Sequence, residues 1–360
     1  MMNRIRVGVL GATGMVGQNY IRLLDGHPWF EVAYVAASPR SAGRTYAEAV
    51  EGRWLMPGPM PESVKQLVVG DANIVGQAKD RCDLVFSAIE EDKEVVRRLE
   101  EAYAAADIPV VSNNSAHRAT EDVPMIVPEV NWQHADLIEV QRKRRGWRKG
   151  LIAVKPNCSI QSYVTPIFAL QQAGFPVEAM IVTTLQAVSG AGFPGPASYT
   201  MIDGVVPFIK AEEEKSEQEP LRVLGRLIEG RIENSKIRIS AHCNRVPVID
   251  GHMACVSVKF AKAKPTIEQV LQIWKDFTSE PQRLGLPSAP NPALIYRNEP
   301  DRPQPRMDRD AGRGMAITLG RLRPCHVFDI RFVGLSHNTI RGAAGGAILM
   351  AELLKAKGYF

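Results

Sequence analysis

Short apolar runs alternate with longer amphipathic stretches in the first third of the chain. Buried strands show short unbroken apolar runs, whereas helices show an apolar face that recurs every three to four positions. The pattern predicts strands at Ile5–Leu10, Glu31–Ala37, Leu84–Ile89 and Ile108–Val111, and helices at Met15–Asp25 and Asp92–Ala106. Strands that alternate with helices in this way indicate βαβ units and a parallel sheet.

The pattern changes after about residue 155, where runs of strands follow one another. Helices are predicted at Ser159–Gln172, Ala211–Gly230 and Ile267–Thr278, strands at Glu178–Leu185, Ile237–Ala241, Met253–Phe260, Ile317–Leu322 and Val327–Val333, and a last amphipathic helix at Thr339–Lys357. Such runs of strands are typical of a mixed or antiparallel sheet in an α+β domain. We therefore expect an α/β protein with a first domain at 1–157 and a second at 158–337, and a helix at 338–360 that returns to the first.

Three glycines, Gly11, Gly14 and Gly17, follow the first strand and open the first helix. This is the context of a dinucleotide-binding turn: one glycine makes the turn, the next lets backbone N–H groups approach the pyrophosphate, and the third permits close helix packing. The helix N-terminus would stabilise the phosphate charge. The alternative is a tight turn without a ligand, which the position after the first strand makes the weaker interpretation.

The end of the second predicted strand distinguishes between cofactors. NAD-binding chains usually carry an acidic residue there, but this chain continues Ser38-Pro39-Arg40-Ser41, and Glu31 lies at the opposite end of the strand. A guanidinium can pair with a 2′-phosphate through two hydrogen bonds. We expect NADP as the cofactor, with NAD as the weaker alternative; the other interpretation of Arg40 is a solvated loop residue.

Charge and cysteine content exclude several classes of protein. The net charge of +5 comes from the stretch 141–149, which holds six cations, so the rest of the chain sums to −1. A solvated helix end explains this stretch better than a nucleic-acid site, and we expect no nucleic-acid partner. Five scattered cysteines without a C-x-x-C pair favour a reducing cytoplasm and no metal site. We also expect no membrane association, because the longest uncharged tract contains prolines and glycines.

Cys158 is the candidate nucleophile. It follows Lys155-Pro156-Asn157 and precedes a predicted helix, and a helix N-terminus or a neighbouring cation lowers the pKa of a thiol. A cysteine buried as a small apolar residue is the competing interpretation. His252 follows Gly251 at the start of a predicted strand and could meet the cysteine in space as its general base.

Three further groups of residues have the composition of a ligand site. Arg245 could bind a carboxylate through a two-pronged contact. The glycine-rich stretch Ser189–Gly195, which follows Gln186, is either a simple crossing of the chain or a place where the backbone approaches a ligand. Glu212 and Lys215 lie three positions apart at a predicted helix start and share a face, although a solvated charged turn is the ordinary reading of that run.

Taken together, these segments resemble aspartate-semialdehyde dehydrogenases of the archaeal and fungal type. The resemblance extends over essentially the whole chain, and its eight motifs occur in order at family-like spacing. They are GATGMVG (11–17), SNNSAHR (112–118), PNCS (156–159), SGAGFPG (189–195), EEEK (212–215), NRVPVIDGH (244–252), RPQPRMDR (302–309) and HNTIRGAAGG (337–346).

The resemblance implies a role for each matching position. Cys158 would be the nucleophile and His252 the general acid and base, accepting the thiol proton. Glu212, rather than Glu213 or Glu214, would bind the substrate together with Arg245 and Gln186. Phosphate would be held by Arg118, Asn157 and Lys215, and NADP by Gly11, Thr13, Gly14, Met15, Val16, Ser38, Arg40, Ser41, Ser189, Gly190 and Asn338.

The implied activity is the reversible, NADPH-dependent conversion of aspartyl phosphate to aspartate semialdehyde and phosphate through a Cys158 thioester. This reaction belongs to lysine, threonine and methionine biosynthesis, and a cytoplasmic homodimer or homotetramer is expected. The alternative is a malonyl-CoA reductase, or another acyl-CoA or acyl-phosphate reductase, of the same family. One departure from the family pattern is the acidic run Glu90-Glu91-Asp92, which bears on the cofactor contacts.

Overall fold

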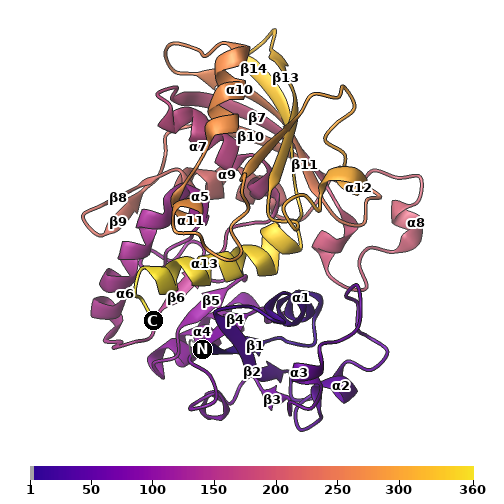
Figure 1. Cartoon of the computed structure of the whole chain (residues 1–360), viewed down its shortest axis with the longest axis vertical. Helices are drawn as coiled ribbons and strands as arrows, with labels where there is room; N and C mark the ends of the chain where they lie inside the picture. Colours follow the sequence, from indigo (N-terminus) through magenta and orange to yellow (C-terminus); the bar gives the residue numbers. More distant parts are fainter. Residues whose placement is uncertain (1–3) are drawn as a thin grey trace.

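The computed structural model describes residues 4–360, so the first three residues of the expected first domain lie outside the described part. Two six-stranded sheets lie at opposite ends of the molecule, and the helix α13 (Gly345–Ala356) crosses between them (Figure 1). The first sheet has the order β3-β2-β1-β4-β5-β6, and all of its strand pairs are parallel. The parallel sheet predicted from the alternating pattern is therefore confirmed.

The first sheet is built from short buried strands, and helices connect them. Its strands are β1 (Ile5–Leu10), β2 (Phe30–Ala37), β3 (Gly70–Asp71), β4 (Leu84–Ser87), β5 (Val110–Ser112) and β6 (Ile152–Val154). The connecting helices are α1 (Met15–Leu24), α2 (Tyr46–Ala49), α3 (Glu62–Lys65), α4 (Lys93–Ala105), α5 (Pro128–Asn131) and α6 (Leu137–Arg145). Ligands of such sheets bind beyond the carboxyl ends of the strands, which places β1, β2 and β4 at the candidate cofactor site.

The second sheet is mixed, with the order β10-β7-β11-β14-β13-β12. Its strands are β7 (Val177–Gln186), β10 (Arg238–Arg245), β11 (His252–Phe260), β12 (Leu294–Arg297), β13 (Ile317–Pro324) and β14 (Ile330–Ser336). The helices of this half are α7 (Val164–Gln172), α8 (Ser198–Met201), α9 (Glu212–Val223), α10 (Ile267–Asp276), α11 (Glu280–Arg283) and α12 (Pro305–Asp308). The predicted α+β character of this half is confirmed.

Helices α7 and α10 cover one face of the mixed sheet, where Trp274 packs on Phe332. Side chains on the other face alternate with the buried ones along each strand, as the period of a strand requires. Ile181 of β7 is 41% exposed, and Cys255 of β11 is also exposed. The second face of this sheet is thus uncovered in the single chain.

Three predicted helices differ from the observed ones, and the one predicted at 159–172 is a short 3₁₀ turn followed by α7 from Val164. The helix predicted at 211–230 ends at Val223, and the chain then forms a hairpin from β8 (Arg226–Ile228) and β9 (Arg231–Glu233). Gly225 lets the start of the hairpin pack closely against its end, because a Cβ atom at this position would lie 2.4 Å from the carbonyl oxygen of Glu233. The expectation of an amphipathic last helix is wrong. Every residue at 345–354 is buried, since α13 packs against α1, α5 and β5.

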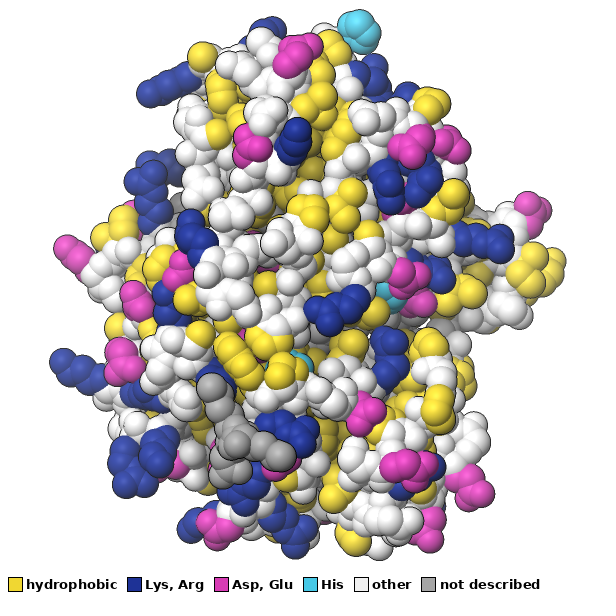
Figure 2. All heavy atoms as spheres, in the orientation of Figure 1, with side chains coloured by type: hydrophobic (Ala, Val, Ile, Leu, Met, Phe, Trp, Pro, Cys, Tyr) yellow, Lys and Arg dark blue, Asp and Glu magenta, His cyan; other side chains and the backbone are white. Residues whose placement is uncertain are grey.

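The cationic stretch 141–149 covers the end of α6 and the four residues after it, which agrees with the interpretation as a helix end. Arg142 pairs with Glu139, Arg144 with Glu121, Arg145 with Asp122 and Glu101, and Arg148 with Asp107. Figure 2 likewise shows cationic and anionic side chains interspersed over the visible face. Across residues 4–360, none of the helices has the length and apolar character needed to cross a bilayer.

Candidate active site

The glycine turn between β1 and α1 leaves an open space on its outer side. Gly11 has φ +75°, and a Cβ atom at Gly17 would lie 2.2 Å from the Gly11 carbonyl oxygen, so both positions require glycine. At Gly14 the nearest atom to such a Cβ is 3.5 Å away, so a ligand has room to approach this backbone. The turn therefore has the shape that a pyrophosphate requires.

A cavity continues from this turn across the ends of β2 and β4. Arg40 lines it and is exposed, whereas Glu31 lies at the other end of β2, where it pairs with Arg4. Ser41 is buried outside this lining, and its N–H donates to the carbonyl oxygen of Ser38. The residues along the cavity are Gly11, Thr13, Gly14, Ala37, Ser38, Pro39, Arg40, Ala72, Asn73, Ala88, Ile89, Glu90, Glu91, Val95 and Leu99. The Arg40 guanidinium has no ion-pair partner among residues 4–360, and its place beside this cavity fits the phosphate of NADP.

A second cavity, of about 350 Å³, lies where the glycine turn meets the second half of the chain. It brings together predicted site residues from segments far apart in the sequence: Met15, Val16, Arg118, Asn157, Cys158, Ser189, Gly190, Glu212, Lys215 and Asn338. Asn338 is fixed in place because its Nδ2 donates to Ser189 Oγ and its Oδ1 accepts from the Gly251 N–H. Gln186, Arg245 and His252 are buried behind this cavity and do not line it.

Cys158 lines the cavity immediately before the short 3₁₀ turn η3 (Ser159–Ser162). The turn has only four residues, so few peptide dipoles add up beside the thiol. Burial, followed by the Glu212 carboxylate, raises the pKa of the Cys158 thiol to about 11, against the opposing charges of Lys155, Arg118 and Arg245. The expected neighbouring cations thus do lower the thiol pKa, but burial and Glu212 outweigh them, and the expected helix N-terminus is only a four-residue 3₁₀ turn.

His252 begins β11 and presents one ring nitrogen without a partner. The backbone N–H of Ala187 donates to His252 Nδ1 over 3.1 Å, so the proton of the neutral ring is on Nε2. Nε2 is buried and has no hydrogen-bond partner among the described residues. Burial lowers the pKa of His252 to about 3, and the charges of Arg245 and His337 add to this effect. His252 is thus a neutral hydrogen-bond donor, and in this tautomer its Nε2 does not accept a thiol proton.

Arg245 ends β10 beside Gln186, because the parallel pairing of β10 with β7 sets these two residues opposite each other. Its Nη1 atom donates to the Ala187 carbonyl oxygen over 2.7 Å. Gly190 lies directly over this pair of groups. A Cβ atom at Gly190 would lie 2.8 Å from Arg245 Nη1 and 3.0 Å from His252 Nε2. Only the backbone of Gly190 therefore lies between the cavity and the side chains of Arg245 and His252.

Of the three consecutive glutamates, only Glu212 reaches the cavity. Its carboxylate accepts from Asn157 Nδ2 at 3.0 Å, from Gln186 Nε2 at 3.2 Å and from Lys215 Nζ at 2.7 Å. Glu213 instead accepts from the backbone N–H of Cys243, and Glu214 lines a neighbouring hollow. The i, i+3 relation between Glu212 and Lys215 forms the ion pair that the spacing permits.

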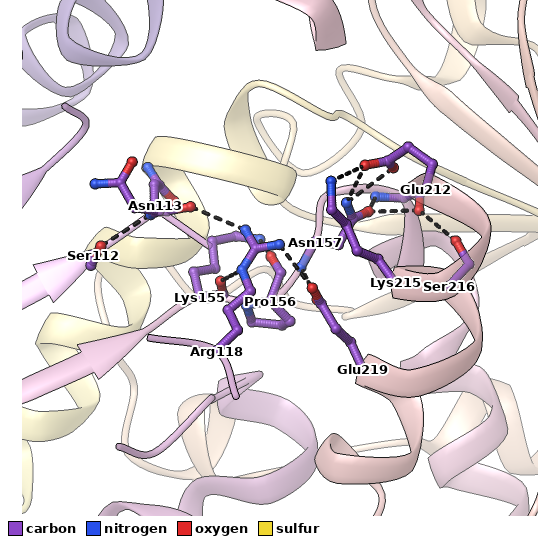
Figure 3. A network of polar contacts seen from close by, with 12 residues as sticks. Ser112, Asn113, Arg118, Lys155, Pro156, Asn157, Glu212, Lys215, Ser216 and Glu219 are labelled. Carbon is purple, nitrogen blue, oxygen red and sulfur yellow. Dashed lines mark hydrogen bonds and ion pairs between the residues drawn. The ribbon is translucent and has the colours of Figure 1, made fainter. Parts of the chain in front are cut away.

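Glu219 is a site residue that the sequence reasoning missed. Arg118 pairs with Glu219 at 2.9 Å and also donates to the carbonyl oxygens of Lys155 and Asn113 (Figure 3). The second oxygen of Glu219 accepts from the backbone N–H of Asn157. The signal was present, because Glu219 lies seven positions after Glu212 and thus on the same face of α9. Asn113, Asn114 and Ser115, a polar run directly after β5, also line the cavity.

Comparison with known proteins identifies relatives over nearly the whole chain. The family model described as semialdehyde dehydrogenase, NAD binding domain, matches residues 6–138, and the one described as semialdehyde dehydrogenase, dimerisation domain, matches residues 167–341. The aspartate-semialdehyde dehydrogenase of Cryptococcus neoformans is 44% identical, covering 99% of this chain and 98% of that protein. That of Archaeoglobus fulgidus is 45% identical, with 98% of each covered.

A solved structure of aspartate-semialdehyde dehydrogenase with NADP from Candida albicans has the same fold. It matches with a TM-score of 0.89 at 40% identity, covering 99% of this chain and 100% of that one. An aspartate semialdehyde dehydrogenase II from Vibrio cholerae, at 24% identity and a TM-score of 0.76, shares the fold. The architecture thus persists where most of the sequence has changed.

Proposed function

Because this chain belongs to the semialdehyde dehydrogenase family, with archaeal and fungal aspartate-semialdehyde dehydrogenases among its relatives, we propose that it catalyses their reaction. It reversibly reduces aspartyl phosphate to aspartate semialdehyde and phosphate with NADPH, as a step of lysine, threonine and methionine biosynthesis. One observation carries the proposal: a single cavity runs from Met15 and Val16, directly after the glycine turn, to the Cys158 thiol and the cations Arg118 and Lys215.

The first half of the chain, 1–157 with the returning helix at 338–360, would hold the cofactor, and 158–337 would carry most of the catalytic groups. NADP would contact the backbone of the glycine turn, Ser38 and Arg40, with Ser189, Gly190 and Asn338 near its reactive end. When bound, NADPH supplies the hydride, while the protein supplies position and charge. Ser41 would hold the turn at Ser38 in place through its backbone hydrogen bond, rather than contact the ligand in the cavity that Arg40 lines.

Cys158 would divide the reaction into two easier steps. When the reaction starts from the acyl phosphate, the thiolate attacks the acyl carbon, a C–S bond forms, and the C–O bond to phosphate breaks to give a thioester. At the aldehyde end, the same thiolate adds to the aldehyde carbon, and a thiohemiacetal forms. Both steps place negative charge on the substrate oxygen. The unpartnered Nε2–H of His252 is suited to donate a hydrogen bond to that oxygen, so its proposed role in this tautomer is that of hydrogen-bond donor.

The remaining site residues would orient the substrate. Arg245 is proposed to bind the substrate carboxylate, and Glu212 its amino group, with Gln186 held against Glu212 near the thioester. Arg118, Asn157 and Lys215 are proposed to bind phosphate. In support, Arg118 and Lys215 both line the cavity that the partly accessible thiol lines, and each of them is held by a glutamate, Glu219 and Glu212 respectively.

We further propose a homodimer, or a tetramer built from such dimers, that buries the free face of the mixed sheet. The family model for residues 167–341 is that of a dimerisation domain, and Ile181 and Cys255 are exposed on this face. Apolar side chains also gather on the projecting segment around α8 (Figure 2), where Tyr199 is 95% exposed. The cytoplasm is the proposed location, which five unpaired cysteines support.

Replacement of the thiol tests the proposal at its centre. In Cys158→Ser, turnover of aspartate semialdehyde is expected to fall by about a thousandfold or more, whereas the Kd for NADP stays unchanged, because the hydroxyl is a far weaker nucleophile. Steady-state kinetics and a binding titration measure the two quantities. The matched control is Cys325→Ser, outside the cavity, with activity equal to the parent. Turnover in Cys158→Ser within tenfold of the parent would contradict the nucleophile assignment.

A further inference from the structure

Glu100 is a buried carboxyl group that the proposed mechanism does not use. It lies on α4, and its side chain is shielded from solvent. Its Oε2 atom has no hydrogen-bond partner among the described residues, and its Oε1 atom contacts a hydroxyl and an amide rather than a cation. Burial of a carboxyl group without a cation is costly. The presence of Glu100 where an apolar residue would pack therefore calls for an explanation.

The hydrogen bonds of Glu100 lead to the end of β5. Ser112 is the last residue of this strand, and its Oγ atom donates to Glu100 Oε1 over 2.6 Å. The Nδ2 atom of Asn114 donates to the same oxygen over 2.9 Å. The Ser112 hydroxyl also accepts from the backbone N–H of Asn114 over 3.0 Å. Glu100 thus holds the side chain of Asn114 directly and its backbone through one hydroxyl.

These contacts fix the orientation of the Asn114 amide. Its nitrogen carries two N–H donors. One donates to Glu100, and the other donates over 3.0 Å to Ser87 Oγ at the end of β4. No group of residues 4–360 donates to Asn114 Oδ1, and Asn114 lines the cavity that also contains the Cys158 thiol. The end of the amide that is left for a ligand is therefore its oxygen, which is a hydrogen-bond acceptor.

An acceptor at this place selects among the proposed ligands. With both N–H groups engaged, the Asn114 amide has no proton to offer a phosphate oxygen, whereas hydroxyl and carboxamide groups can donate to it. Ser87 and Ser112 end neighbouring parallel strands, and the carboxyl ends of such strands are where a dinucleotide binds. The nicotinamide half of the cofactor carries both kinds of donor, in its ribose hydroxyls and its carboxamide N–H.

We propose that Glu100 is a positioning residue for the cofactor, because it turns the Asn114 amide so that Oδ1 accepts a hydrogen bond from the nicotinamide half of NADPH. The inference rests on the proposed function in taking NADPH as the ligand. It adds Asn114 to the residues that contact the cofactor and gives the buried carboxyl of Glu100 a purpose.

The role of Glu100 requires an accepting oxygen rather than a charge. Burial raises the pKa of Glu100, against the hydrogen bonds from Ser112 and Asn114, which lower it. A neutral carboxyl group still accepts at Oε1. Glutamine at this position would keep an oxygen for both donors, whereas methionine would fill the space without an acceptor. The two substitutions therefore separate the hydrogen bond from the shape of the side chain.

The Kd of NADPH for the free enzyme tests the proposal without turnover, and a fluorescence titration measures it. In Asn114→Ala we expect the Kd to rise by about tenfold, because one hydrogen bond to the cofactor is lost. In Glu100→Met the amide is no longer held in one orientation, so we expect a rise of about threefold or more. Glu100→Gln keeps the accepting oxygen and should bind NADPH about as tightly as the parent.

A double-mutant cycle shows whether Glu100 acts through Asn114. Once Asn114 is replaced by alanine, no amide remains to be turned, so adding Glu100→Met should not raise the Kd further. A general loosening of the fold would instead add the two effects. The matched control is Glu101→Met on the same helix, which removes a carboxylate that pairs with Arg145 and should leave the Kd unchanged. Thermal unfolding of each variant checks the fold.

A second ligand locates the effect on the cofactor. Adenosine 2′,5′-bisphosphate lacks the nicotinamide half, so its Kd should be the same in the parent, Asn114→Ala and Glu100→Met. An equal loss for this ligand would overturn the proposal, as would additive effects in the double variant.

An unchanged Kd for NADPH in Asn114→Ala would also overturn the proposal, even if Glu100→Met does not fold. The same holds if Glu100→Gln binds NADPH as weakly as Glu100→Met. Failure of the proposed function would appear differently, as a parent protein that binds NADPH with the expected dependence on Asn114 but does not turn over aspartate semialdehyde.

Discussion

At the scale of single residues, the surroundings of Cys158 and His252 decide what chemistry each can do. The residue types were predictable from the sequence, because a cysteine in PNCS and a histidine in NRVPVIDGH lie at family-like positions. Their protonation was not, because it depends on contacts made across the fold. The Ala187 N–H that selects the His252 tautomer is 65 residues away, and Glu212, which raises the thiol pKa, is 54 positions from Cys158.

Gly190 provides a test of the site at this scale. A methyl group at this position would press on Arg245 Nη1 and His252 Nε2, both of which are buried and cannot retreat freely. Gly190→Ala is expected to lower kcat/KM for aspartate semialdehyde by about tenfold to a hundredfold, because small displacements of catalytic groups are costly. The control is Gly76→Ala, where nothing lies within 4 Å of the added atom. Equal kcat/KM in the two variants, measured with intact folds, would show that Gly190 does not contact the working site.

At the scale of elements, the repeating pattern predicted the long strands of both sheets, but it missed β3, β6, β12 and the β8–β9 hairpin and misjudged the last helix. Parallel strands of the first sheet and the α/β alternation followed from apolar runs with glycine turns between them. The burial of α13 on all sides did not follow from the sequence. Glu352 and the small residues Gly345 and Gly346 interrupt its apolar residues, as the residues of a solvent-exposed face would. Glu352 is instead buried, and it accepts from His27 and from Ser288. A buried polar contact of this kind cannot be read from periodicity alone.

The ion pair between Arg341 of the turn η5 (Ile340–Ala344) and Glu129 of α5 is expected to hold these elements together. Both side chains are 1% exposed, and Arg341 also donates to the Met315 carbonyl oxygen. Arg341→Met leaves a buried carboxylate unpaired, so we expect the free energy of unfolding to fall by about 3–5 kcal/mol. The double variant Glu129→Met with Arg341→Met should recover part of this loss.

Urea unfolding measures both changes. Arg148→Met, which breaks an exposed pair with Asp107, is the control and should cost less than about 1 kcal/mol. A loss in Arg341→Met no larger than in Arg148→Met would contradict the role assigned to the buried pair.

At the scale of the whole molecule, the site exists only where the two halves of the chain meet. The glycine turn comes from the first sheet, the thiol from the segment between the sheets, and His252 and Arg245 from the second sheet. The motifs predicted which residues belong to the site, including the i, i+3 pair on α9. They did not predict that Gln186, Arg245 and His252 lie behind Gly190, because that depth depends on how the second sheet packs against the loop after β7.

The free face of the mixed sheet is expected to be a contact between two copies of the chain. Ile181 lies on this face. In a symmetric dimer, a carboxylate at position 181 would lose its hydration and lie close to the same carboxylate of the second copy. Ile181→Asp is therefore expected to raise the dimer Kd by at least about tenfold. Sedimentation velocity over a range of concentrations measures this change. Val68→Asp places the same charge at an exposed site on the first half and should leave the Kd unchanged. A dimer in Ile181→Asp as stable as in Val68→Asp would move the contact to another surface.

The most direct test of the central claim is NADP reduction by the purified protein with aspartate semialdehyde, with and without inorganic phosphate. NADPH oxidation with malonyl-CoA is measured beside it. We predict that NADPH forms only when aspartate semialdehyde and phosphate are both present. Activity with malonyl-CoA alone would contradict the substrate assignment while leaving the roles of Cys158 and of the glycine turn intact.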